Sequence, residues 1–353
     1  MWGGAGEVLQ TALSGFFSGT HRTRTIAVVS IISGLVNLVL DCVLIFGLDP
    51  AWWGGEGPRV WELGIAGAGI ASVISFWFKA VCYGAILLRP QFRSTYGIAR
   101  GLGLDRRMMA RLIYFGFPAG LMYATEAGAF TVIVLMIGRL GDVPLQATTM
   151  AINFNMIAFI PLVGLSIAVS VLVGNHLVGS GPARAVRCVW AALTIAWAYS
   201  AAWALIYWFG AETMISLYSI NPAATTIPHD AKLALQTAQG LLGFVAIYVL
   251  LDATQLILAG ALRGAGDTWF VLLAGLSVSV ITLTIGFAWE PAWQPALWGE
   301  NASTGAAEFG SMSASVSAVL YWWWKVITAF VVLLAAAMTA RYLQGSWKKM
   351  RMV

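Results

Sequence analysis

The sequence has few charged residues for its length. Charged residues make up 10% of the 353 residues, whereas hydrophobic residues make up 59%. A soluble globular domain carries about a quarter charged residues. This composition therefore excludes a protein that folds mainly in contact with water, and it indicates a chain surrounded by lipid.

Cysteine and histidine are also scarce, with three of each, and they lie far apart. Cys42, Cys82 and Cys188 lack C-x-x-C spacing, so we interpret them as small core residues. The isolated histidines argue against a zinc or haem site, and against a membrane-embedded enzyme with clustered His, Asp or Ser. The sequence contains no Walker A motif. We therefore expect no enzyme activity, no ATP hydrolysis and no cofactor.

Long apolar segments dominate the chain. Eight of them contain roughly 20 or more residues, enough to cross the hydrocarbon core as helices. The stretch Val8–Phe17 is also apolar but too short to cross unaided. We predict an all-α polytopic membrane protein with about eight complete transmembrane helices. They cover Thr25–Phe46, Ile65–Leu88, Leu112–Ile137, Leu145–Leu172, Ala185–Phe209, Leu235–Leu262, Trp269–Ala288 and Val319–Leu343.

The charges of the connections predict the orientation of these helices. One set of connections is basic, with Arg22, Arg24, Arg89, Arg93, Arg100, Arg106, Arg107, Arg111, Arg184, Arg187, Arg263, Arg341, Lys348, Lys349 and Arg351. The alternate set is mainly acidic, with Asp49, Glu56, Glu62, Asp142, Glu212, Asp230, Glu290, Glu300 and Glu308 against Arg59, Arg139 and Lys232. Basic connections stay in the cytoplasm. We expect a multi-pass protein of the inner or plasma membrane with a cytoplasmic C-terminus.

The same charges bear on partners. The net charge of +5 is explained by topology and contact with anionic lipid, so we expect no nucleic-acid partner. Trp289 and the run Trp322-Trp-Trp324 flank outer ends of helices, where an aromatic belt is expected.

A short pattern occurs twice. Gly15-Phe-Phe-Ser-Gly19 is followed after three residues by Thr23, and Gly260-Ala-Leu-Arg-Gly264 is followed after three residues by Thr268. Both copies follow an apolar run and stand at a cytoplasmic junction between helices. Secondary transporters often contain such internal repeats. The pattern favours two related halves.

Several longer motifs occur in an order that carries a family resemblance. They are Ser18-Gly-Thr-His-Arg-Thr-Arg-Thr25, Asn37-Leu-Val-Leu-Asp41, Leu63-Gly-Ile-Ala-Gly-Ala-Gly69, Gly116-Phe-Pro118 with Glu126, Gly138-Arg-Leu-Gly141, Ala151-Ile-Asn-Phe154, Val171-Leu-Val-Gly174, Asp252-Ala-Thr-Gln255 and Leu258-Ala-Gly-Ala-Leu-Arg-Gly-Ala-Gly-Asp-Thr268. Together they resemble the MATE (multidrug and toxic compound extrusion) family, of the NorM/DinF-like type, within the MOP superfamily. Thr148 and Thr149 depart from the His-Gln that many members have.

The resemblance implies a domain organisation. Members of the family typically have twelve helices in two six-helix lobes. Residues 1–88 would form a partial N-terminal lobe with the end of helix four and helices five and six. Residues 89–111 would be a cytoplasmic linker, and residues 112–353 the C-terminal lobe. About three and a half helices would be absent, through a gene-model error or a true relic, or supplied by a second chain.

Few ionisable residues lie deep in the apolar segments. They are Glu126, Asp252, Asp41 and Lys79. A charge at membrane depth costs roughly 3 kcal/mol or more, so each such carboxylate is a functional hypothesis. Two nearby carboxylates can take up a proton or bind a sodium ion, and either can be exchanged for a cationic compound. For Lys79 we favour a structural role in which it extends toward the interface.

Neutral groups near these acids could complete the site. Tyr248 lies four residues before Asp252, on the same helical face. Asn153 and Asn155 offer amide oxygens from a third helix. The resemblance implies that Glu126, Asp252, Tyr248 and Asn153 couple transport to a cation. In some branches it implies the same for residues at Asn37 and Asp41, which stand one helical turn apart.

These observations favour an antiporter that exchanges H+ or Na+ for small organic compounds, often cationic, by alternating access. Its expected partners are the substrate and the bilayer. A lipid-linked oligosaccharide flippase of the same superfamily remains an alternative, although its cavity would be more strongly cationic. A truncated product without transport activity is a further alternative.

Overall fold

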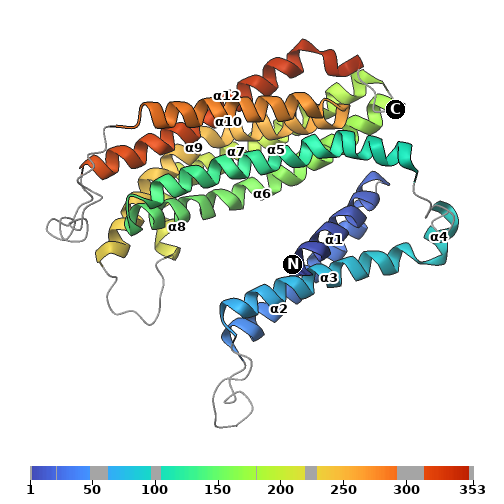
Figure 1. Cartoon of the computed structure of the whole chain (residues 1–353), viewed down its shortest axis with the longest axis horizontal. Helices are drawn as coiled ribbons and strands as arrows, with labels where there is room; N and C mark the ends of the chain where they lie inside the picture. The colour runs from blue at the N-terminus through green and yellow to red at the C-terminus, as the bar shows by residue number, and fades with distance from the viewer. Residues whose placement is uncertain are drawn as a thin grey trace, which may run out of the picture. The chain divides into compact units, whose positions relative to one another are not determined.

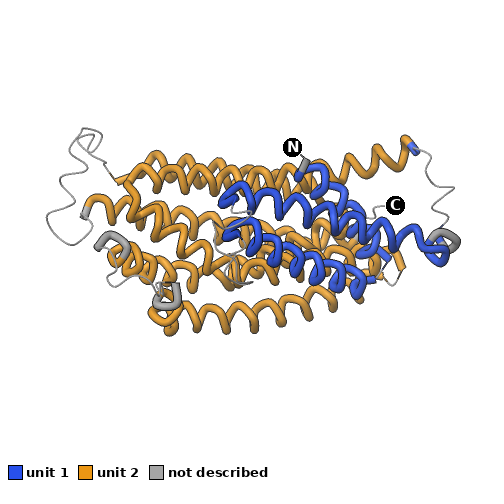
Figure 2. The backbone as a smooth tube through the Cα atoms, turned by 90° about the horizontal axis from the view of Figure 1, so that it is seen from below, with its two compact units in different colours: residues 1–105 blue, residues 106–353 orange. Residues whose placement is uncertain are grey.

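The computed structural model describes residues 2–20, 22–47, 63–96, 105–179, 181–218, 229–291 and 314–349. Every regular element within these ranges is helical, as predicted. The chain divides into two compact units, residues 1–105 and 106–353 (Figure 2). Each unit has its own packing and is described separately.

The helices are long relative to those of soluble proteins. Unit 1 contains α1 (Trp2–Gly19), α2 (Thr23–Phe46), α3 (Ile65–Leu87) and α4 (Pro90–Tyr96). Unit 2 contains α5 (Arg106–Gly138), α6 (Asp142–Gly179), α7 (Pro182–Phe209), α8 (Ala211–Tyr218), α9 (His229–Ala265), α10 (Thr268–Ala288), α12 (Ala314–Gln344) and a short 3-10 turn at Ser346–Lys349.

The eight predicted membrane spans are confirmed. Eight helices in the described part of the chain are long and apolar enough to cross a membrane, and each covers one predicted segment, with α3 ending one residue before the predicted Leu88. The helices α5 and α6 extend well beyond the predicted segments and continue through Pro118 and Pro161. The short helices α4 and α8 were not predicted, because neither has a long apolar run. Some of the connecting charges lie outside the described residues, namely Asp49, Glu56, Arg59, Glu62, Arg100, Glu300, Glu308 and Arg351.

Helix α9 is the centre of unit 2. In its most apolar 18-residue stretch 67% of the residues are buried, against 39% or less in every other span. Helices α6, α7 and α12 pack against α9, and α10 packs against α5 and α12 (Figure 1). A helix buried on most of its surface contacts protein instead of lipid, so polar side chains on α9 can be satisfied by neighbouring helices.

Two glycines of the repeated pattern bring α6 and α9 into backbone contact. A Cβ atom at Gly260 would collide with Ser166, and one at Gly264 would collide with the backbone of Ser170. The next small residue along α6, Gly174, approaches the carbonyl of Gly264. Small residues at four-residue spacing let membrane helices approach this closely.

The end of α9 is fixed by the residues that follow Gly264. Gly266 has a φ of 94°, a left-handed conformation that favours glycine, and the Asp267 N–H donates to the Leu262 carbonyl at 2.9 Å. The Asp267 carboxylate, 7% exposed, then pairs with Arg341 of α12 at 2.7 Å. The motif thus joins three helices at one end of unit 2.

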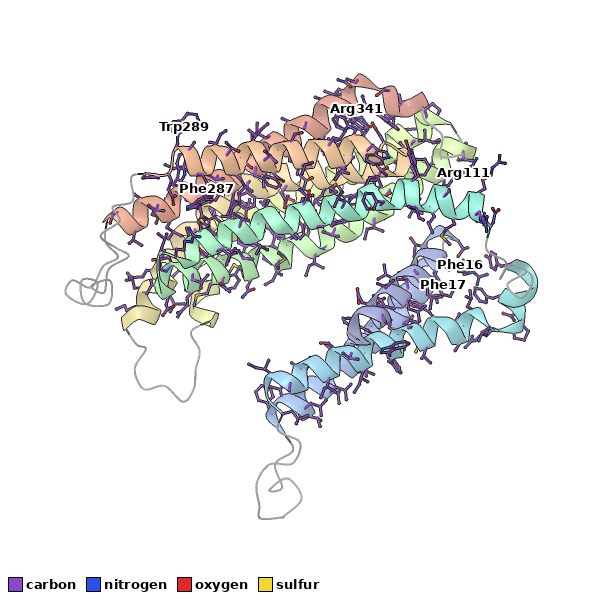
Figure 3. All side chains as sticks on the ribbon, in the orientation of Figure 1. Phe16, Phe17, Arg111, Phe287, Trp289 and Arg341 are labelled. Atoms are coloured by element: carbon purple, nitrogen blue, oxygen red, sulfur yellow. The ribbon has the colours of Figure 1, made fainter. Side chains whose placement is uncertain are left out.

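The first copy of the pattern makes a similar turn in unit 1. The Arg22 N–H donates to the Phe17 carbonyl at 2.9 Å. Phe17, labelled in Figure 3, is fully buried. Its ring contacts those of Tyr83 and Phe92. In the numbering of the repeat, Phe17 corresponds to Leu262 and Arg22 to Asp267, so both junctions form the same backbone hydrogen bond.

The tryptophans at the outer end of α12 differ from the predicted aromatic belt. Trp289 is exposed next to α10, as predicted, but Trp323 and Trp324 are buried. Their indole N–H groups donate to Glu290 at 3.0 Å and to Thr148 at 3.3 Å. For Trp323 and Trp324 the belt prediction is therefore wrong, because internal acceptors let both rings pack inside unit 2.

Arg111 and Arg341 lie toward one end of unit 2, and Phe287 and Trp289 lie toward the other (Figure 3).

The helix crossing at Gly264 can be tested with an alanine. Gly264→Ala should lower the stability of the protein by about 1–3 kcal/mol, because the new methyl group overlaps the α6 backbone. Gly243→Ala, on the same helix but with no atom near the added carbon, is the matched control. Melting temperatures of both variants in detergent check the expectation. Equal melting temperatures would contradict it.

Candidate functional site

Glu126 lies on α5 and is partly buried. Its Oε1 atom is fully shielded and forms no hydrogen bond with any described residue. A buried carboxylate oxygen without a partner is costly. It is therefore a position at which a proton or a small cation would be stabilised.

Asp252 lies on the central helix α9 and is 6% exposed. The Gln255 amide donates to its Oδ1 atom at 3.4 Å, which is a long and weak hydrogen bond. The other end of the same amide, Oε1, is buried and unpaired, and Gln255 is 5% exposed. Two unsatisfied oxygens, one on Glu126 and one on Gln255, thus occur on α5 and α9.

The two acids interact through space. Glu126 is within electrostatic range of both Arg263 and Asp252, and Arg263 has the stronger influence. The attraction between Glu126 and Arg263 offsets part of the cost of burying the carboxylate, whereas Asp252 repels it. No hydrogen bond joins Glu126 to Asp252 among the described residues, so any influence of one acid on the other acts through space.

Arg263 joins the three helices around these two acids, which we call the acidic cluster. Its guanidinium donates to the Tyr123 hydroxyl on α5 at 2.9 Å and to the Ser166 hydroxyl on α6 at 3.1 Å. The guanidinium also lies over the Tyr123 ring, 5.3 Å from its centre. Ser166 in turn donates to the Leu256 carbonyl at 2.6 Å, one turn after Asp252. This chain of contacts fixes α5 and α6 against the part of α9 that carries the acid.

A tyrosine on the same helix lies beside Asp252. Tyr248 is 5% exposed and lies within electrostatic range of Asp252 and of Tyr207 of α7. The Tyr207 hydroxyl donates to the Phe154 carbonyl of α6 at 2.9 Å. Tyr248 therefore lies next to Asp252, on the helical face that its spacing predicts.

The two asparagines of α6 differ in their surroundings. Asn153 is exposed, whereas Asn155 is half-buried with a shielded amide oxygen that has no partner among the described residues. Asn155 lies eleven residues before Ser166, which is about three helical turns, so it shares the face of α6 that contacts α9. The role of Asn153 stays a prediction, and the geometry favours Asn155 for an oxygen directed inward.

Asn37 and Asp41 lie on α2 in unit 1. Both are half-buried, and the amide nitrogen of Asn37 is shielded without a partner. No contact joins them to another ionisable group in unit 1 among the hydrogen bonds and ion pairs of the described residues. Their role in cation binding stays a prediction.

A cavity of about 360 Å³ lies elsewhere in unit 2. Tyr207, Trp208 and Ala211 line one side of it, and Gln236, Gln239, Gly240 and Gly243 line the other. Neither Glu126 nor Asp252 lines this cavity.

Three participants were not predicted from the sequence. Gln255 and Arg263 lie in motifs that carried the family resemblance, whereas Ser166 lies between two of them. The eleven-residue spacing between Asp252 and Arg263, about three turns, was the available signal, because it puts both side chains on one face of α9. The contacts of Ser166 depend on the crossing of α6 and α9, which the sequence does not give.

Comparison with known proteins identifies relatives along most of the chain. The MatE family profile matches residues 118–288. A protein of Pseudomonas aeruginosa described as "Probable multidrug resistance protein NorM" is 30% identical over 315 residues, covering 79% of this chain and 62% of the relative. A NorM protein of Xanthomonas campestris is 30% identical over 76% of this chain and 54% of its own length. The chain thus spans about half to three fifths of these relatives.

Solved structures show the same fold. A eukaryotic MATE transporter, AtDTX14, matches with a TM-score of 0.73 and 18% identity, covering 96% of this chain and 66% of that one. A mutant of the Vibrio cholerae MATE transporter VcmN matches with a TM-score of 0.69 and 16% identity, covering 98% and 69%. The helical fold, the confirmed membrane spans and these relatives lead to one conclusion: the chain is a multi-pass membrane protein that belongs to the MATE family.

Proposed function

We propose that the protein is a cation-coupled antiporter that exports small organic, often cationic, compounds by alternating access, and that Glu126 and Asp252 bind the coupling ion. The observation that carries this proposal is the pair of membrane-embedded carboxylates, Glu126 on α5 and Asp252 on α9. One oxygen of Glu126 is buried without a hydrogen-bond partner, and so is the amide oxygen of Gln255 beside Asp252. Ionisable residues inside membrane segments are rare and typically functional.

The coupling ion would be H+ or Na+. A proton on either carboxylate removes its charge, and a sodium ion compensates it while needing additional oxygen ligands. Gln255 and Tyr248 offer neutral oxygens on α9 close to Asp252, and Asn155 offers a shielded amide oxygen on α6. A second positive charge, on the cargo, would be disfavoured once the ion is bound. Ion binding would therefore lower the affinity for a cationic substrate and drive its release.

We further propose an orientation in the cell membrane with the C-terminus in the cytoplasm. The basic residues of the connections support this assignment, because Lys and Arg are enriched on the cytoplasmic side. The substrate then moves outward while the cation moves inward.

Removing either acid tests the mechanism. Glu126→Gln and Asp252→Asn should each reduce cation-driven efflux from vesicles at least about tenfold, because a neutral amide cannot exchange a compensating cation. Asp142→Asn, at an exposed position in the first turn of α6, is the control and should retain efflux. Undiminished efflux in both variants would exclude the two acids from the mechanism.

The two asparagines can be separated in the same assay. Asn155→Leu should weaken the dependence of efflux on the coupling ion several-fold, because it removes the shielded amide oxygen on the α9-facing side of α6. Asn153→Leu should have a smaller effect if its exposed amide is not a ligand. A reversed order of effects would assign the ligand role to Asn153.

Accessible cysteines test the orientation. In a background where Cys42, Cys82 and Cys188 are replaced by alanine, Arg184→Cys places a thiol at an exposed position at the start of α7, and Glu212→Cys places one in the first turn of α8, just beyond the other end of α7. A membrane-impermeant maleimide added to intact cells should label position 212 and not position 184. The opposite labelling pattern would show that the chain is inserted with its C-terminus outside.

A further inference from the structure

The proposed mechanism does not use the guanidinium of Arg263, which lies beside the acidic cluster. Its hydrogen bonds go to two neutral hydroxyls, of Tyr123 and Ser166, and not to a carboxylate. A guanidinium keeps its positive charge at all physiological pH values and has five donors. Arg263 lies in the last turn of α9 and is partly buried, and a permanent charge that is partly removed from water is stabilised by a negative charge nearby.

The geometry supplies that compensation from Glu126. Tyr123, which holds the guanidinium, lies three residues before Glu126 on α5, so both side chains lie on adjacent parts of one helical face. Glu126 has a shielded oxygen without a hydrogen-bond partner, and Arg263 has donors that its two hydroxyl partners do not use. Arg263 and a bound cation are thus alternative partners for Glu126.

We propose that Arg263 is a fixed counter-charge of the acidic site, which leaves one net negative charge on the cluster and so makes the site accept one monovalent cation at a time. The inference rests on the proposed coupling through Glu126 and Asp252. With both acids ionised and Arg263 positive, one added positive charge neutralises the cluster. A divalent cation would leave an uncompensated positive charge in a low-dielectric interior, which is unfavourable.

The other groups around the cluster do not alter this sum. On α5 and α9 the titratable neighbours are Tyr123 and Tyr248, and α7 contributes Tyr207. Tyrosines are neutral near physiological pH. On α6, Ser166 and Asn155 are neutral as well. The preference for charge one therefore depends on Arg263 among the described side chains of the cluster.

The binding of Na+ and of Ca2+ to the purified full chain tests the proposal by calorimetry at alkaline pH, where carboxylates are ionised. The wild type should bind one Na+ per chain and bind Ca2+ more weakly. Arg263→Gln leaves two net negative charges, so the ratio of Ca2+ to Na+ affinity should rise at least about tenfold. Arg263→Lys keeps the charge and should keep the wild-type ratio. Arg184→Gln, which removes an exposed arginine at the start of α7, should also leave the ratio unchanged.

A second variant covers the case in which Arg263→Gln does not fold. The double variant Glu126→Gln/Arg263→Gln removes one charge of each sign, so it should have the wild-type ratio of Ca2+ to Na+ affinity. Glu126→Gln alone should lose Na+ binding, because the cluster then has no net charge. Size-exclusion profiles verify folding of each variant. Three results would overturn the proposal. They are an unchanged ratio of Ca2+ to Na+ affinity in Arg263→Gln, Na+ binding that is retained in Glu126→Gln, and a wild type that binds neither ion. Efflux by the acid variants is measured separately, so loss of efflux with an unchanged ratio would reject Arg263 alone and leave the antiporter mechanism standing.

Discussion

The close crossing of α6 and α9 is the constraint on which the rest of unit 2 depends. Between membrane helices the lipid supplies no hydrophobic driving force, so association relies on van der Waals contact and hydrogen bonds. Gly260 and Gly264 allow backbone contact with α6, and this contact brings the Ser166 hydroxyl within reach of both the Leu256 carbonyl and Arg263. The position of Asp252 relative to α5 follows from these contacts.

The same crossing explains why polar groups concentrate on α9. A helix facing lipid cannot keep an unpaired carboxylate or amide without a large desolvation cost. Because α9 is surrounded by α6, α7 and α12, Asp252 and Gln255 are enclosed by protein. Their neighbours satisfy them only in part, and the remaining unsatisfied oxygens are what a small cation would bind. Packing and proposed chemistry therefore depend on the same few small residues.

Hydropathy predicted the helices well because a membrane span needs a long apolar run, and all eight runs became spans. The acids Glu126 and Asp252 could be singled out as candidates from sequence, since an ionisable residue inside such a run is conspicuous. Their neighbours Gln255 and Arg263 were not singled out, because a neutral amide inside a span and an arginine near a helix end both have several ordinary interpretations. The burial of Trp323 and Trp324 could not be predicted either, because it depends on acceptors contributed by Glu290 and Thr148 from distant parts of the chain.

The repeated pattern separates what the two units share from what they do not. Both copies close their turn with the same backbone hydrogen bond, from Arg22 to Phe17 and from Asp267 to Leu262. Side-chain charge is not repeated: Ser18 stands where the second copy has Arg263. The polar pair of unit 1, Asn37 and Asp41, lies on the helix after the junction, whereas Asp252 lies on the helix before it. A backbone turn tolerates many side chains, but a charge cluster needs partners from several helices at once. The turn can therefore persist in both units while the acidic cluster with its arginine belongs to unit 2, and this makes unit 2 the part of the chain in which cation coupling is best sought.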